Sequence, residues 1–98
     1  MTKQDAMRLI GNLAPQARQL GVTALYLFGS TARGKASPAS DLDIFVEYDP
    51  SRPFSLLDLI RVKHLVEDAG AVNVDITTRA GLHPALRSRI ERESVRIF

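Results

Sequence analysis

Residues 25–46, LYLFGSTARGKASPASDLDIFV, decide the fold of this chain. They begin as an apolar run typical of a strand, turn at Gly29 and Ser30, and continue through small residues. They end in a second strand pattern that carries Asp41 and Asp43. A strand, a Gly-Ser turn and an acidic strand in this order are typical of a phosphate-binding turn that faces metal-binding carboxylates. The stretch therefore predicts both the middle of a sheet and a candidate site.

Composition places the chain among ordinary globular proteins. Its 98 residues, of which 45% are hydrophobic and 24% charged, suit one soluble domain with a single core. The formal net charge is only +2, although five arginines stand against two glutamates from Arg79 to the end of the chain. This density of positive charge is too low for a nucleic-acid-binding arm, so we expect no direct nucleic-acid binding.

Two absences exclude other classes of protein. The chain has no cysteine, which rules out disulfides, thiolate zinc sites and cysteine nucleophiles. Its first 13 residues lack the apolar core of a signal peptide, and no apolar run approaches the roughly 18 residues that a membrane helix needs. We therefore expect a cytoplasmic protein that does not engage a membrane.

Four segments carry strand patterns, namely residues 22–28, 41–48, 71–77 and 95–98. The first is almost continuously apolar, as expected for a strand covered on both faces. In the second, alternation places Asp41, Asp43 and Phe45 on one face. The third segment alternates as well, and its polar face carries Asp75. The fourth is short and closes the chain.

Capping residues predict two helices before the first strand. Thr2 and Asp5 form a capping-box pattern at the start of the first helix. Pro15 is unfavourable inside a helix, so we expect a break near Leu13 and a second short helix that Gly21 ends. The two segments together precede the apolar strand.

Two longer helices are predicted later in the chain. Ser55 and Asp58 form a second capping pattern, and the helix should end before Gly70. Its expected apolar stripe consists of Leu56, Leu59, Val62, Val66 and Ala69. Pro84 should open the last helix, which continues to about Arg92. Leu86 and Ile90 would be its buried side.

The order of these elements predicts the α+β class. Helices and strands alternate without an internal repeat, a linker or a low-complexity tract. We expect one domain over residues 1–98, with a mixed β-sheet of about four strands and one layer of helices packed against it.

The Gly-Ser turn could hold an anion. Gly29 lets the backbone approach a ligand, and Ser30 or Thr31 would cap a short helix whose free N–H groups suit a phosphate. Arg33 lies one helical turn later and could reach a phosphate oxygen. A solvated arginine, or one paired with a local acid, is equally consistent with the sequence. Residues 35–40 then form a loop before the acidic strand.

Three acids point to a divalent metal. Asp41 and Asp43 share a strand face, and Asp75 lies on a later strand with the same alternation. If the two strands are neighbours, three like charges meet and raise at least one pKa unless a cation neutralises them. Carboxylate oxygens without cysteine favour Mg²⁺ or Mn²⁺ over zinc. Paired acids on an exposed strand are also common without any ligand.

Together these residues resemble a known family signature. The motif GSTARG at residues 29–34, followed by SDLDIFV at residues 40–46, is similar to that of the DNA-polymerase-β-like nucleotidyltransferases. The short chain resembles their minimal nucleotidyltransferase branch, of the antitoxin type. The later VDI at residues 74–76 looks like the strand that carries the third acid of this family. The resemblance covers nearly the whole chain.

The resemblance implies Mg²⁺-dependent transfer of AMP from ATP, a nucleoside triphosphate, to an acceptor hydroxyl. Gly29, Ser30 and Arg33 would bind the nucleotide. Asp41 and Asp43 would bind two metal ions, and Asp75 would bind the ion nearer the acceptor. Asp75 would also help to deprotonate the acceptor hydroxyl.

The resemblance also implies a partner. Minimal members of the family commonly act as antitoxins that transfer AMP to a tyrosine of a small helical toxin of the HEPN type. Two alternatives stay open: a steric antitoxin or nucleotide-binding subunit without turnover, and a small-molecule nucleotidyltransferase like the aminoglycoside-modifying relatives. The sequence also leaves a homo-oligomer open.

Overall fold

A mixed sheet forms the centre of the computed structural model, which describes residues 1–37 and 40–98. Its four strands within these residues are β1 (Val22–Phe28), β2 (Leu42–Tyr48), β3 (Val74–Thr78) and β4 (Val95–Arg96). They lie in the order β3-β2-β1-β4. β1 is antiparallel to both β2 and β4, whereas β2 is parallel to β3. The predicted α+β fold with a mixed sheet is thus confirmed.

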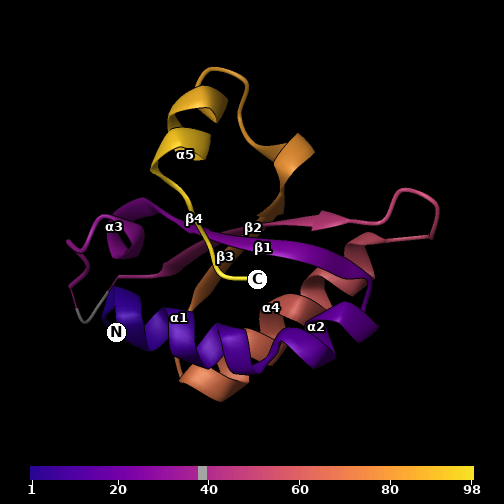
Figure 1. The fold of residues 1–98 in the computed structure, drawn as a ribbon, viewed down its shortest axis with the longest axis horizontal. Helices are drawn as coiled ribbons and strands as arrows, with labels where there is room; N and C mark the ends of the chain where they lie inside the picture. Colours follow the sequence, from indigo (N-terminus) through magenta and orange to yellow (C-terminus); the bar gives the residue numbers. More distant parts are fainter. Residues whose placement is uncertain (38–39) are drawn as a thin grey trace.

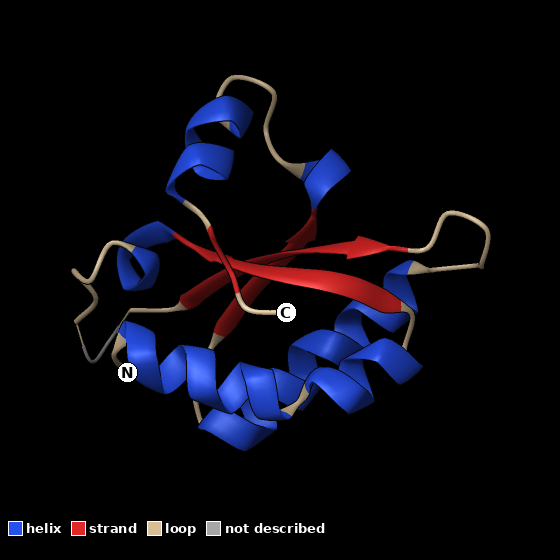
Figure 2. Ribbon diagram, viewed as in Figure 1, coloured by secondary structure: helices blue, strands red, loops and turns tan. Residues whose placement is uncertain are grey.

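Helices lie on both faces of this sheet. The helical segments are α1 (Lys3–Asn12), α2 (Ala14–Gln19), α3 (Gly29–Ala32), α4 (Leu56–Gly70), η1 (Arg79–Gly81) and α5 (Arg87–Glu93). In Figure 1, α1, α2 and α4 form a layer on one face, and α5 lies on the opposite face. The expectation of one helix layer is therefore wrong. Figure 2 shows the same division by secondary structure.

The larger core lies between the sheet and the layer of α1, α2 and α4. Alternate residues of β2, Leu42, Ile44 and Val46, are buried and point into it. The helices contribute fully buried residues that include Ile10 and Val62. Burial of such side chains is the main force that holds the layer on the sheet.

An aromatic cluster explains the helix on the other face. Phe45 has 0% exposed surface, although it lies outside the larger core. Its ring stacks on Tyr26 at a centroid distance of 4.7 Å and contacts Phe28 at 5.7 Å. The guanidinium of Arg79 lies over Tyr26 and Phe45, at 4.8 and 5.0 Å from the ring centroids. This apolar area needs a cover, and Arg79 and α5 provide it.

Both predicted capping boxes are present. The Thr2 side chain accepts from the Asp5 amide while the Asp5 carboxylate accepts from the Thr2 amide, and Ser55 and Asp58 do the same for α4. Leu13 separates α1 from α2, and Pro15 lies in the first turn of α2. The break predicted there is thus confirmed.

The end of α4 differs from the prediction. Gly70 is its last residue, and Ala71 takes the left-handed conformation with a φ of 48°. An added Cβ at Gly70 would lie 2.8 Å from Cδ2 of Leu9 in α1, so the end of the Leu9 side chain would have to move. The glycine therefore permits close packing of α1 and α4 instead of a turn. β3 consequently starts at Val74 rather than at residue 71.

The apolar stripe expected on α4 is only partly correct. Val62 and Val66 are buried and Leu59 packs against the core, but Leu56 and Ala69 are exposed. Leu56 precedes Val62 by six residues, which places it about 120° away around the helix. Ala69 lies in the last turn.

The C-terminal elements are shorter than predicted. α5 begins at Arg87 rather than at Pro84, and Leu86, expected to be buried, is 48% exposed. β4 contains only Val95–Arg96 of the predicted residues 95–98. Part of the loop predicted over residues 35–40, namely residues 38–39, lies outside the described residues. No helix among the described residues is long and apolar enough to span a membrane.

Candidate active site

The register of the sheet places two of the predicted acids side by side. Asp43 on β2 is opposite Asp75 on the parallel neighbour β3, and opposite Phe28 on β1. Directly paired residues of adjacent strands point to the same face. Asp41 lies one residue before β2, two positions from Asp43. The predicted neighbourhood of the two strands, on which the candidate site depends, is confirmed.

Gly29 makes room for one of these acids. It follows β1 directly and has a φ of +73°, a conformation that other residues rarely adopt. A Cβ at this position would lie 3.0 Å from Cγ of Asp43 and closer still to its Oδ2. The glycine was expected to let a ligand approach the backbone. The structure shows that it also brings the Gly-Ser turn against the carboxylate of Asp43.

The turn itself differs in one detail from the prediction. Helix α3 has only four residues, Gly29–Ala32, and its N-cap is Phe28, which makes no side-chain capping bond. The expectation that Ser30 or Thr31 caps this helix is therefore wrong. Within residues 1–37 and 40–98, the hydroxyl of Ser30 makes no hydrogen bond to another residue. The N–H groups of a first helical turn have no partner within the helix, so the turn can still donate to an anion.

The carboxyl group of Asp43 is held in an unfavourable environment for its charge. Burial raises its pKa, and the negative charges of Asp75 and Asp41 raise it further. The positive charge of Arg33 offsets part of this increase. A cation near these three acids would relieve the repulsion, so the donor set suits a hard divalent ion.

The side chains of the three acids do not form a preassembled metal site in the described part of the chain. Among the described residues, no three acidic, histidine or cysteine side chains are close enough to hold one ion together. Strand pairing thus brings the backbones of Asp43 and Asp75 together, while an ion would have to draw the side chains inward.

Arg33 is engaged by an acid from the far end of the chain. Its Nη1 lies 3.4 Å from Oε2 of Glu93 on α5, and both side chains are partly exposed. This acid is 60 residues away, so it is not the local partner that the sequence left open, and contact of Arg33 with a phosphate stays a prediction. The positive charge of Arg33 also lowers the pKa of Asp43.

Sequence reasoning missed the role of Arg79. Its Nε and Nη2 lie 2.7 and 2.6 Å from Oε1 of Glu47 on β2, and its Nη1 pairs with Glu91 on α5. Arg79 thus fixes α5 over the face of the sheet that carries Asp43. The alternation of β2 already placed Glu47 on the same face as Asp43. This alternation was the sequence signal for a charged partner such as Arg79 on that face.

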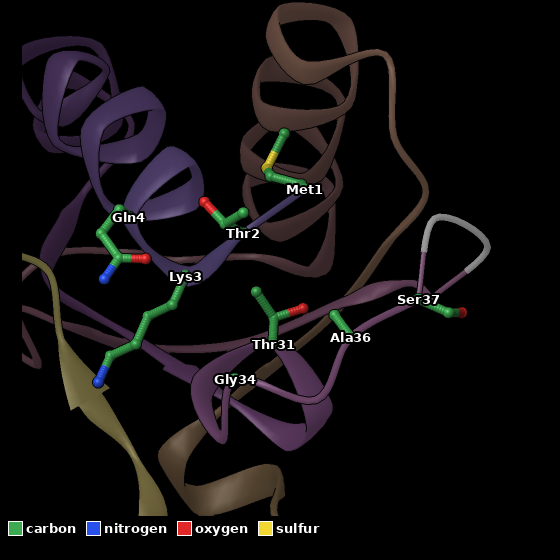
Figure 3. Close-up of a pocket in the computed structure, with 8 residues that line it drawn as sticks. All are labelled: Met1, Thr2, Lys3, Gln4, Thr31, Gly34, Ala36 and Ser37. Carbon is green, nitrogen blue, oxygen red and sulfur yellow. The ribbon is translucent and has the colours of Figure 1, made fainter.

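A hollow of about 460 Å³ lies beside the Gly-Ser turn, between α3 and the start of α1 (Figure 3). Its lining residues are Met1, Thr2, Lys3, Gln4, Thr31, Gly34, Ala36 and Ser37. None of the three predicted acids lines it. Thr31 and Gly34, which follow the Gly-Ser turn, line this hollow.

Fold and site together define a class of enzyme. A mixed sheet in which a Gly-Ser turn after one strand abuts acids on the next two is the arrangement expected of a nucleotidyltransferase. The chain belongs to the nucleotidyltransferase domain family, whose model matches residues 10–97. It is accordingly an enzyme that transfers a nucleotide, as the sequence predicts.

Individual relatives support this membership. The chain is 40% identical over 78 residues to a Methanocaldococcus jannaschii protein that bears the name of a protein adenylyltransferase; the match spans 80% of this chain and 82% of the relative. A solved structure that bears the name of a minimal nucleotidyltransferase is 34% identical, with a TM-score of 0.81, and the match covers 97% of this chain and 95% of that one.

A more distant structure shares the fold alone. It is a complex of a tri-AMPylated HEPN toxin with an MNT antitoxin from Shewanella oneidensis. The match has 17% identity and a TM-score of 0.65, and it covers 94% of this chain and 71% of that one.

Proposed function

We propose that this enzyme moves AMP from ATP to a hydroxyl group of a partner protein. The acceptor oxygen bonds to the α-phosphorus of ATP, the bond between the α- and β-phosphates breaks, and pyrophosphate leaves. The observation that carries the proposal is the pairing of Asp43 with Asp75 beside Gly29, which joins a phosphate-binding turn to acids from two strands. The name of the Methanocaldococcus jannaschii relative, a protein adenylyltransferase, supports AMP as the group transferred and protein as the acceptor.

Each residue of the site has a distinct role in this proposal. The backbone of Gly29 and the hydroxyl of Ser30 hold the triphosphate, and Arg33 pairs with one of its oxygens. Asp41 and Asp43 would hold two Mg²⁺ ions, and Asp75 would be a further ligand on the side of the acceptor. Such ions neutralise phosphate charge and stabilise the entering and leaving oxygens. Asp75 accepts the proton of the acceptor hydroxyl.

The acceptor is proposed to be a tyrosine of a small helical toxin of the HEPN type. The fold match to an antitoxin in complex with a tri-AMPylated HEPN toxin supports such a pairing. In this reading the toxin supplies the acceptor, and the present chain supplies the nucleotide and the acids. Modification of the toxin would make the chain an antitoxin.

A steric antitoxin or nucleotide-binding subunit without turnover is the second candidate. The ungathered carboxylates among the described residues are the observation in its favour. The complete set of Gly29, Ser30, Asp41, Asp43 and Asp75 argues for turnover, because binding alone does not need an acid to accept a proton.

Label transfer distinguishes these candidates. Wild-type protein incubated with Mg²⁺, ATP labelled in the α-phosphate and the co-encoded helical partner should label that partner. Asp41→Asn should reduce the labelling about a thousandfold, because loss of a metal ligand removes several kcal/mol of transition-state stabilisation. Asp68→Asn, which changes an exposed acid of α4, is the matched control and should label normally.

The result has clear alternatives. Inhibition of the partner by both wild type and Asp41→Asn, without label in either, would establish the steric candidate. Label on an added aminoglycoside, and none on the partner, would establish the small-molecule alternative.

The ion pair between Arg33 and Glu93 gives a second prediction. Glu93→Gln should tighten the binding of Mg²⁺-ATP about two- to fivefold, because it frees Arg33 from an exposed pair of modest strength. Isothermal titration measures the dissociation constant. In an Arg33→Ala background the same substitution should change nothing. An equal effect in both backgrounds would show that Glu93 acts without Arg33.

A further inference from the structure

Exposed apolar side chains gather at one place on the surface. Leu56, Leu57 and Ile60 on α4 are 72%, 55% and 37% exposed, and they form what we name the α4 patch. Tyr48, 37% exposed, stacks on Phe54 just before this helix. Among the described residues, these are four of the five large apolar side chains with such exposure. A cluster of this kind on a helix marks an interaction surface.

The patch lies away from the candidate active site. α4 belongs to the helix layer on one face of the sheet, whereas α5 lies on the other face (Figure 1). Phe45 contacts Arg79 on the face of α5, and strand alternation places Asp43 on the same face. Along β2, the patch is at the Tyr48 end, about 16 Å from Asp43 at the opposite end. A protein that presents its hydroxyl to the acids therefore has no need to cover the patch.

The charges beside the patch are self-complementary. Asp58 and Arg61 form an ion pair of 3.4 Å one helical turn apart, and both lie on the same flank of α4. An antiparallel copy of α4, related by a twofold axis near residues 59 and 60, would place Arg61 beside the partner's Asp58. The same axis would pack Leu57 and Ile60 against the equivalent apolar side chains. Such a two-fold contact uses one surface twice.

We infer that the α4 patch joins two copies of this chain in an antiparallel dimer. The apolar ridge supplies the buried centre, and the alternating Asp58 and Arg61 charges form its rim. Both candidate active sites would face outward, so each could meet its acceptor independently. The inference does not depend on the proposed function, because no residue of the patch belongs to the candidate active site.

Light scattering after size-exclusion chromatography tests the dimer. Wild type at about 50 µM, a concentration in the range of weak dimers, should have twice the 10.8 kDa mass of the chain. Ile60→Asp should shift it to the monomer and raise the dimer dissociation constant at least about tenfold. Leu86→Asp changes an exposed leucine outside the patch and should remain dimeric. Circular dichroism verifies that each variant is folded.

The flanking charges give an independent variant that should fold normally. Arg61→Glu faces the partner's Asp58 with a like charge, so it should weaken the dimer, and less so in 0.5 M salt, because salt screens exposed charges. A monomeric wild type, or a dimer that persists in both Ile60→Asp and Arg61→Glu, would overturn the inference. A monomeric wild type whose helical partner binds only when Ile60 is intact would assign the patch to that partner instead.

Discussion

Asparagine in place of Asp43 is expected to lower nucleotide transfer by about a thousandfold or more while the protein stays folded. The carboxylate is paired with Asp75 across two strands and abuts Gly29, so it lies where the metal ions and the phosphates are proposed to meet. Asparagine keeps the shape of the side chain but removes its charge, which should cost several kcal/mol in the transition state. Single-turnover label transfer measures the loss.

The same substitution should stabilise the metal-free protein. Burial and the charges of Asp75 and Asp41 raise the pKa of Asp43, so its charge destabilises the metal-free fold. The destabilisation is absent below the unfolded-state pKa of about 3.9 and grows as the pH rises through the higher folded-state value. In EDTA at pH 7.5, Asp43→Asn should therefore melt at a higher temperature than wild type. Its free energy of unfolding should be higher by at most about 1 kcal/mol, because the Asp43 side chain is half-exposed.

Two comparisons make this result specific. The difference in melting temperature between Asp43→Asn and wild type should shrink as the pH falls toward 4. Mg²⁺ with ATP should stabilise wild type and not the variant, because the ions need the carboxylate. Asp68→Asn should behave as wild type throughout. A variant that melts lower than wild type in EDTA would mean that the charge of Asp43 does not destabilise the fold.

Alanine in place of Gly29 is expected to damage both stability and activity. The backbone there has a φ of +73°, and a Cβ would lie 3.0 Å from Cγ of Asp43. Backbone strain and displacement of the carboxylate should together cost about 2 kcal/mol. The melting temperature should fall by roughly 10 °C for a domain of this size. A displaced Asp43 should lower transfer about a hundredfold.

The chain contains a matched control for this substitution. Gly11 lies inside α1 without a positive φ, and the contact of a Cβ there within the described part of the chain would be with Ile97, at 3.9 Å. Gly11→Ala should therefore raise the melting temperature, because alanine favours a helix by about 1 kcal/mol. Removing the carboxylate, in Asp43→Ala, should reduce the cost of Gly29→Ala to its backbone part. Equal costs in both backgrounds would show that the contact with Asp43 is unimportant.

The sequence predicts the middle of this fold well, because its signals there are local. Alternation over residues 41–48 places Asp43 and Phe45 on one face, and the structure agrees. The capping pairs that begin with Thr2 and Ser55 need only four consecutive residues each, and both are present. The pairing of β2 with β3 was a condition of the site prediction, and the register confirms it.

The errors arise where distant residues decide the structure. Helix α5 lies on the second face because Arg79, Glu91 and the aromatic ring of Phe45 meet there, which no local pattern of residues 84–92 predicts. Gly70 stays in α4 and Ala71 takes the left-handed conformation instead, while an added Cβ at Gly70 would meet Leu9, 61 positions earlier. Arg33 likewise meets Glu93 from the other end of the chain. The proposed roles of the site residues stay predictions for the experiments above.

The connection to β3 has a consequence for synthesis of the protein. β1, the Gly-Ser turn and β2 are adjacent in sequence and can pair as soon as residues 22–48 have emerged. Asp75 joins them only after α4 has crossed to the far side of β2 and β3 has docked in parallel. A truncated or half-made chain would thus carry the turn and two acids without the third. The chain would therefore become able to transfer a nucleotide only when β3 pairs with β2 and brings Asp75 beside Asp43.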